Sequence, residues 1–230
     1  SNNPGPNSQN DDAIMDYDIS SKNLEVYDST LRGKRPDGAE THEFDIEIES
    51  GGGGVDIQDS WIGLVSSNGG LEIRGTNNYT VYVSNSTLRL GVSACLDGYG
   101  CNETYQNSYL TIKNSTITND VQMKNIVNTL VQDSELENNL NLDSINATIS
   151  DSKILGRLNV DVFNLNIHNL EKLHGMSDWG SDGVCEYASI DNVTFTSSVI
   201  IDGISVDLTN SSFSSSVEIS HDIVNMTNIS

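Results

Sequence analysis

Apolar and polar residues alternate over short stretches of this chain, and turn-forming residues interrupt the alternation. Leu158, Val160 and Val162 follow this two-residue period, and Val199 and Ile201 do the same. The period is typical of a half-buried strand, and the Asn, Asp, Ser and Gly residues at the interruptions favour turns. No stretch has helical spacing long enough to predict a helix. The pattern therefore predicts short strands joined by tight turns.

The same pattern recurs as a repeat: apolar, any, Asp or Asn, usually Ser, any, apolar. We call the Asp or Asn of each copy the anchor. From Asn114 the anchors lie 19, 18, 18, 23, 18 and 18 residues apart, and the 23-residue step is one period with a five-residue insertion. A fixed short period predicts a solenoid. The anchors are Asp28, Asp59, Asn85, Asn114, Asp133, Asp151, Asn169, Asn192, Asn210 and Asn228.

One coil of three short strands cannot bury its own apolar side, so coils must stack with their strands paired in parallel. We therefore expect an all-β chain that folds as a parallel β-helix (β-solenoid) of about ten coils with loop insertions. The anchors should form one column that faces solvent at a turn, because Asp133 stacked on Asp151 in a dry interior would be costly. The residues expected to be buried together are Ile149, Ile154, Leu158 and Val160.

The copies V-S-N-S-T-L at Asn85 and I-S-D-S-K-I at Asp151 resemble the coil repeats of right-handed parallel β-helices. This is the pectin-lyase-like superfamily, and the likeness is greatest to secreted archaeal and bacterial cell-surface β-solenoids. The resemblance covers roughly residues 19–230 and implies a right-handed helix. Members include polysaccharide lyases and hydrolases, viral tail spikes, adhesins and surface proteins, so the fold alone does not choose a function.

The spacing of the anchors divides the chain into parts. We expect residues 1–18 to form an N-terminal extension held by a neighbour in an assembly, and residues 19–230 to form a single solenoid domain. Within that domain, residues 19–110 are the loop-decorated half and residues 111–230 the regular half. Loops rich in Gly, Asp, Asn and Ser are predicted at residues 32–41, 51–54, 66–70, 93–108 and 174–188.

Charge narrows the list of partners. The net charge of −22 and the 11 Lys and Arg residues argue against nucleic acid and against an acidic membrane surface, since both need clustered basic residues. The sequence contains no run of 18 apolar residues, so it predicts no membrane span. The chain begins at Ser1 with no signal-peptide pattern, and we expect a processed protein whose leader has been removed. The expected location is extracellular, at the cell surface.

Nine sequons of the form N-x-S/T predict N-linked glycans, although Asn and Ser are also what the turns of the repeat need. An alternative function for the acidic positions is Ca²⁺ binding on the acidic column or loops, because paired carboxylates are Ca²⁺ ligands. No other cofactor is expected. The sequon asparagines are Asn78, Asn85, Asn102, Asn114, Asn146, Asn192, Asn210, Asn225 and Asn228.

Three cysteines are present. Cys95 and Cys101 bracket L-D-G-Y-G and could close a local disulfide. Cys185 lies several coils away, so an intermolecular disulfide or a thiol is expected there. Metal ligation is not expected, because the cysteines and the four histidines (His42, His168, His174, His221) have no metal-site spacing.

An enzymatic function is the less favoured hypothesis. Hydrolases of the resembling superfamily carry clustered Asp, His-Gly and Arg-Ile-Lys, and its lyases need a basic residue and Ca²⁺-binding Asp. This chain has His174-Gly175 but no Asn-Thr-Asp or Arg-Ile-Lys. Asp178, Asp182 and Glu186 beside His174 are the best acid/base candidates, and a solvated acidic loop is the favoured interpretation of them. We therefore expect no catalytic residues.

What remains is a structural role. The sequence stops within a coil at Ser230, and an open strand edge invites another subunit to continue the stack. We expect a glycosylated structural protein that assembles with copies of itself into an S-layer, sheath or filament. The alternatives are a β-helix polysaccharide-degrading enzyme, a glycan-binding adhesin and a viral spike.

Overall fold

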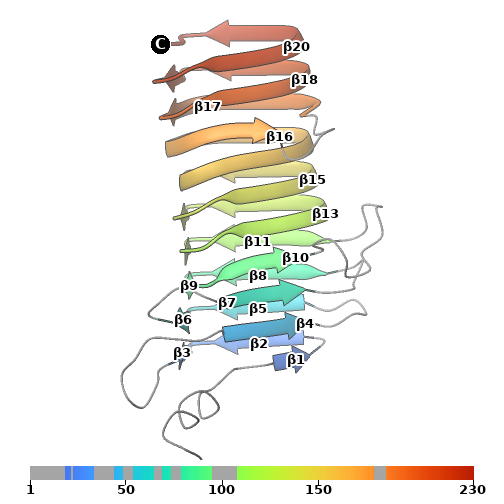
Figure 1. The fold of residues 1–230 in the computed structure, drawn as a ribbon, viewed down its shortest axis with the longest axis vertical. Helices are drawn as coiled ribbons and strands as arrows, with labels where there is room; N and C mark the ends of the chain where they lie inside the picture. Colours follow the sequence, from blue (N-terminus) through green and yellow to red (C-terminus); the bar gives the residue numbers. More distant parts are fainter. Residues whose placement is uncertain are drawn as a thin grey trace, which may run out of the picture.

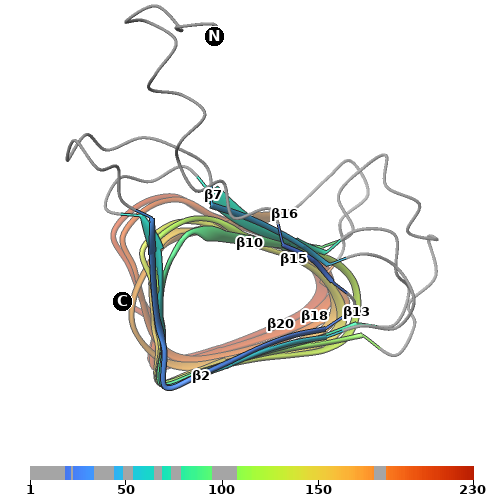
Figure 2. The same ribbon diagram turned by 90° about the horizontal axis from the view of Figure 1, so that it is seen from below.

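The computed structural model describes residues 19–21, 23–33, 44–48, 54–64, 69–73, 79–94, 108–178 and 185–230. These residues form an all-β solenoid with no helix, and every pairing between strands is parallel. Figure 1 shows the coils stacked along one axis, and Figure 2 shows the triangular cross-section that three faces produce. The predicted all-β fold and the predicted parallel stacking are confirmed.

The first face of the triangle is a stack of strands that pair in order from one coil to the next. Long strands contribute to more than one face because they turn the corner without a break. The strands of this stack are β1 (Ile19–Ser21), β4 (Phe44–Ile48), β7 (Gly69–Ile73), β10 (Gly91–Ala94) and parts of β13 (Val121–Gln132), β15 (Leu140–Ser150), β16 (Lys153–Asp178), β18 (Val199–Thr209) and β20 (Val217–Thr227).

The second face precedes the anchors along each coil, and the third face follows them. The second face contains β2 (Asn23–Tyr27), β5 (Gly54–Gln58), β8 (Thr80–Ser84), β11 (Tyr109–Lys113), part of β17 (Tyr187–Phe195) and parts of β13, β15, β16, β18 and β20. The third face contains β3 (Thr30–Gly33), β6 (Trp61–Leu64), β9 (Thr87–Arg89), β12 (Thr116–Ile117), β14 (Glu135–Leu136), β19 (Ser212–Phe213) and parts of β16 and β17.

The core is one apolar column inside the triangle. Alternate residues of each strand point inward and stack on their equivalents one coil away, as Ile149 stacks on Ile167. Burying each such side chain contributes about 1.5–3 kcal/mol, which is the main stabilisation that stacking provides. The four residues predicted to be buried together, Ile149, Ile154, Leu158 and Val160, are at most 1% exposed.

The predicted loops were too long at their ends. Strands reach into each of the five ranges because their outer residues still pair in register with the coil beside them, as Gly91–Ala94 pair with residues 70–73. The described residues of those ranges that are strand are 32–33, 54, 69–70, 93–94, 174–178 and 187–188. The rest of these ranges, and residues 1–18, lie almost wholly outside the described residues.

Candidate functional site

The anchors mark the corner between the second and third faces, and all ten have the left-handed backbone conformation. Their φ angles lie between 46° and 55°. Asn and Asp tolerate this conformation best among residues with a side chain, which explains why the repeat requires them. The anchors are exposed, so the predicted solvent-facing column is confirmed.

Side-chain amides join many of the anchors from coil to coil. Nδ2 of Asn114 donates to Oδ1 of Asn85 at 2.8 Å, and Nδ2 of Asn192 donates to Oδ1 of Asn169 at 3.0 Å. Acidic anchors accept the same kind of hydrogen bond. Nδ2 of Asn169 donates to Oδ1 of Asp151 at 3.1 Å. Asp133 and Asp151 are neighbours in the column, as are Asp28 and Asp59, so like charges replace the amide ladder at these two places.

The serine that follows most anchors points inward and forms a second ladder. Each hydroxyl donates to the carbonyl two residues before it at 2.6–2.7 Å. Each hydroxyl also accepts the backbone N–H of the serine one coil before it at 3.1–3.2 Å. The hydroxyls are therefore satisfied although the residues are buried. The serines of this ladder are Ser60, Ser86, Ser115, Ser134 and Ser152.

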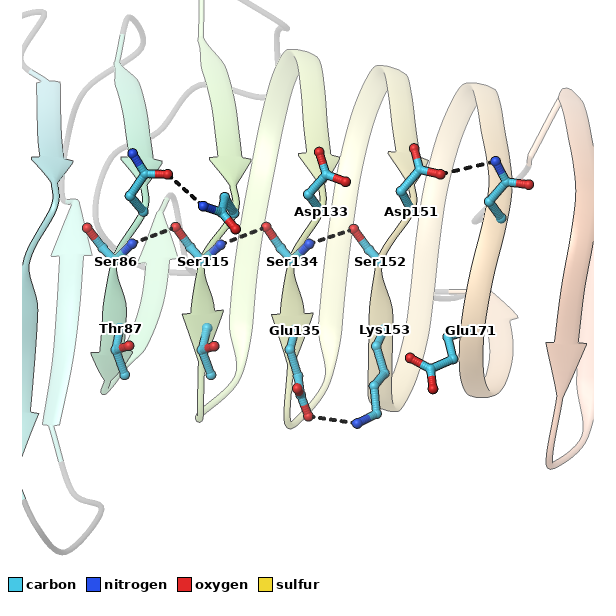
Figure 3. A pocket seen from close by; sticks show the side chains of 14 residues that line it. Ser86, Thr87, Ser115, Asp133, Ser134, Glu135, Asp151, Ser152, Lys153 and Glu171 are labelled. Carbon is cyan, nitrogen blue, oxygen red and sulfur yellow. Dashed lines mark hydrogen bonds and ion pairs between the residues drawn. The ribbon is translucent and has the colours of Figure 1, made fainter.

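A shallow polar groove of about 540 Å³ runs along this corner (Figure 3). Its wall beyond the serine ladder carries Thr87, Glu135, Lys153 and Glu171. Nζ of Lys153 donates to Oε1 of Glu135 at 3.0 Å, and this bond is the main cause that raises the pKa of Lys153. The groove can present carboxylates and one ammonium to a ligand, but its buried hydroxyls are already committed to the backbone.

Two of the four acid/base candidates, His174 and Glu186, have side chains within the described part of the chain. His174 is exposed near the end of β16, and Glu186 is half-buried before β17. Asp182 and the side chain of Asp178 lie outside the described residues. His42 and the side chain of His221 also lie outside the described residues. His168 is half-buried beside the anchor Asn169. Within the described ranges, no group of three His, Cys, Asp or Glu could hold a metal ion.

The cysteines were predicted to form disulfides. Cys95 and Cys101 lie outside the described residues, so their pairing stays a prediction. Cys185 is only 1% exposed and packs in the core column, where its thiol lies 4.0 Å from the carbonyl oxygen of Tyr187. An intermolecular disulfide through this side chain would require the coil to open. The sequence did not reveal that Cys185 is buried.

Seven of the nine sequon asparagines are described, and their amides share one arrangement. Each donates Nδ2 to an oxygen of the preceding coil, at distances of 2.7–3.1 Å. An N-glycosidic bond would replace one of the two amide hydrogens and leave the other for this bond. Asn146 is half-buried, whereas Asn85, Asn114, Asn192, Asn210, Asn225 and Asn228 are exposed. Asn78 and Asn102 lie outside the described residues.

Two other titratable groups have shifted pKa values, one through its hydrogen-bond partners and one through burial. Hydrogen bonds from Thr209 at 2.6 Å and Asn210 at 2.9 Å lower the pKa of Asp191. Burial raises the pKa of Tyr79, whose hydroxyl donates to the carbonyl of Lys124 at 2.7 Å. The bonds of Asp191 join neighbouring coils, whereas the bond of Tyr79 passes the coil of Ser108 and reaches the coil after it. Both arrangements stabilise the stack.

Comparisons with protein-family models, with curated proteins and with solved structures gave no match. Across the described part of the chain, no helix is long and apolar enough to span a membrane.

Proposed function

We propose that this chain is an extracellular structural protein that assembles with copies of itself into a cell-surface layer, sheath or filament and carries N-linked glycans. The architecture supports a structural role because polar side chains along the anchor corner are hydrogen-bonded from coil to coil. Such ladders hold each coil in fixed register with the next, which suits a rigid rod.

The apolar column at β20 is the main observation that supports self-assembly. Val224 and Met226 lie directly above Val206 and Leu208, which are fully buried. In β20 the same positions are 41% and 52% exposed, because no described coil covers them. A further parallel coil would bury these side chains and pair the strand edge. We propose that a second copy supplies that coil.

The test compares two Lys substitutions of exposed apolar residues. Met226→Lys places a charge in the column that the next copy would cover. Ile200→Lys is the control, because Ile200 is 42% exposed on the outer surface of β18. Sedimentation and electron microscopy should show polymers for the natural chain and for Ile200→Lys. They should show monomers for Met226→Lys, with unchanged circular dichroism.

A natural chain that sediments as a monomer at physiological salt, with no polymer in micrographs, would contradict the proposal. Equal assembly by Met226→Lys would show that the contact lies elsewhere.

A further inference from the structure

One column on the outer surface of the second face lies five residues before the anchors. In five successive coils its members are Tyr109, Asn128, Asn146, Asn164 and Tyr187, which pair in register. Phe163 lies beside this column and contacts Tyr187 with ring centroids 5.6 Å apart. We call these six residues the amide strip.

The amides of the strip are fixed in place and its rings are exposed. Nδ2 of Asn146 donates to Oδ1 of Asn128 at 3.0 Å, and Nδ2 of Asn164 donates to Oδ1 of Asn146 at 2.8 Å. Each carboxamide has two N–H groups and two lone pairs, so Asn128 and Asn164 keep hydrogen-bonding capacity beyond this ladder. Nδ2 of Asn146 also donates to the carbonyl of Val127 at 3.4 Å. Tyr109, Phe163 and Tyr187 are 39%, 45% and 45% exposed. Aromatic side chains therefore lie at both ends of a row of ordered amides.

The strip and the next outward column carry no charge, although the chain has a net charge of −22. Within these two columns an anionic partner would find no cation, and a cationic partner would find no carboxylate. The half-buried Asp143 and Asp161 lie outside the two columns, three residues before Asn146 and Asn164. The surface therefore suits a neutral partner that offers hydroxyls to amides and an apolar face to rings. The residues of the neighbouring column are Thr111, Leu130, Thr148, Asn166 and Ser189.

A neutral sugar chain has this chemistry. The C–H face of a pyranose ring packs on an exposed aromatic ring, and its hydroxyls both donate to and accept from a carboxamide. Five coils at about 4.8 Å place the outer members of the column about 19 Å apart, which is long enough for several sugar units. We propose that the amide strip binds a neutral polysaccharide lying along the solenoid axis. This inference goes beyond the structural role and does not depend on self-assembly.

The test is affinity electrophoresis in native gels that contain soluble hydroxyethyl cellulose, mannan or dextran, with polygalacturonate as the acidic counterpart. The full chain without N-glycans is used, because Asn146 is itself in a sequon and a glycan there would cover the strip. Met226→Lys serves as a monomeric background. At least one neutral polysaccharide should retard the chain, polygalacturonate should not, and added salt should leave the retardation unchanged.

The variants locate the binding surface. Tyr187→Ala and Tyr109→Ala should each weaken binding about tenfold, whereas Tyr187→Phe should retain it because the ring remains. Tyr27→Ala is the matched control, because Tyr27 is 45% exposed on the same face several coils away. No retardation by any of the three neutral polysaccharides would overturn the proposal. Retardation by polygalacturonate alone, or equal weakening by Tyr27→Ala, would also overturn it.

Discussion

Ser134 donates its backbone N–H to the hydroxyl of Ser152 at 3.1 Å, and that hydroxyl donates to the carbonyl of Ser150 at 2.6 Å. One buried hydroxyl therefore satisfies a donor in the preceding coil and an acceptor in its own. Ser152 is 3% exposed, so water cannot replace the hydroxyl without opening the stack. The inward column of small polar residues is thus part of the stabilising framework.

Ser152→Ala should destabilise the chain by about 1–3 kcal/mol, because it leaves the buried N–H of Ser134 without its partner. The carbonyl of Ser150 loses one of two donors and still accepts the N–H of Asp133 at 3.2 Å. The midpoint of unfolding in urea measures the effect. Ser212→Ala is the control, since its hydroxyl bond to Thr194 is exposed and its loss should change the midpoint little. Equal midpoints for the two variants would contradict the assigned role of the ladder.

Asn169→Ala should cost about 1–2 kcal/mol, because alanine tolerates a φ of 55° poorly. Asn169→Gly should lie between the natural chain and Asn169→Ala, since glycine accepts the backbone conformation but loses the amide bonds. Asn166→Ala, in the same strand but outside the left-handed positions, is the control. A higher urea midpoint for Asn169→Ala than for Asn169→Gly would show that backbone conformation does not dominate at the anchors.

Gly156→Ala should destabilise the chain by about 1–3 kcal/mol. A Cβ at Gly156 would lie 2.6 Å from the carbonyl oxygen of Asn138 in the adjacent coil, so the two coils would have to separate. A Cβ at Gly70 would meet nothing within 4 Å. Gly70→Ala should therefore leave stability unchanged or raise it by up to about 1 kcal/mol. Thermal unfolding of the two variants checks the contrast.

Asp191 should stabilise the fold in a pH-dependent way. Its pKa is lowered below 3.8 by Thr209 and Asn210, so the carboxylate stabilises the folded chain above pH 3.8. This contribution is lost as the pH falls through the lowered pKa. The stability difference between the natural chain and Asp191→Ala should be largest near neutral pH and should shrink in acid. A difference that stays constant from neutral pH to below 3.8 would contradict this linkage.

Sequon-containing peptides of the chain from its native source should exceed the masses of the bare peptides if sequons are occupied. The exposed corner sites Asn85 and Asn114 should carry glycan more often than the half-buried Asn146. Peptide mass spectrometry after glycosidase treatment in heavy water identifies the occupied sites. Unmodified peptides at every sequon would remove glycosylation from the proposed function.

The alternation of apolar residues was enough to predict the stack, because inward positions such as Ile149 must be apolar in every coil. The anchors were correctly placed at a solvent-facing corner. The sequence argument did not assign their left-handed backbone, although a position restricted to Asn and Asp is a signal for it. The direction of the following serine was also missed, because a polar residue in the interior becomes acceptable only when its partners are known.

The amide strip was missed for a different reason. Tyr109 and Tyr187 are 78 residues apart in sequence and share a column only through parallel register. A signal was nevertheless present, since both lie five residues before an anchor. The insertion preceding Asn192 hid this relation, because Tyr187 was placed within a loop range and not in a strand.

The hydroxyl of Tyr79 reaches Lys124 across an intervening corner that contains Ser108. Most hydrogen bonds of the solenoid join adjacent coils, so a rod pulled from its ends should peel apart one coil at a time. Each regular coil would release about 60 Å of extended chain, from 18 residues at roughly 3.4 Å each. Between Tyr79 and Lys124 the tether should make the coils yield together, as one larger step in a force–extension trace.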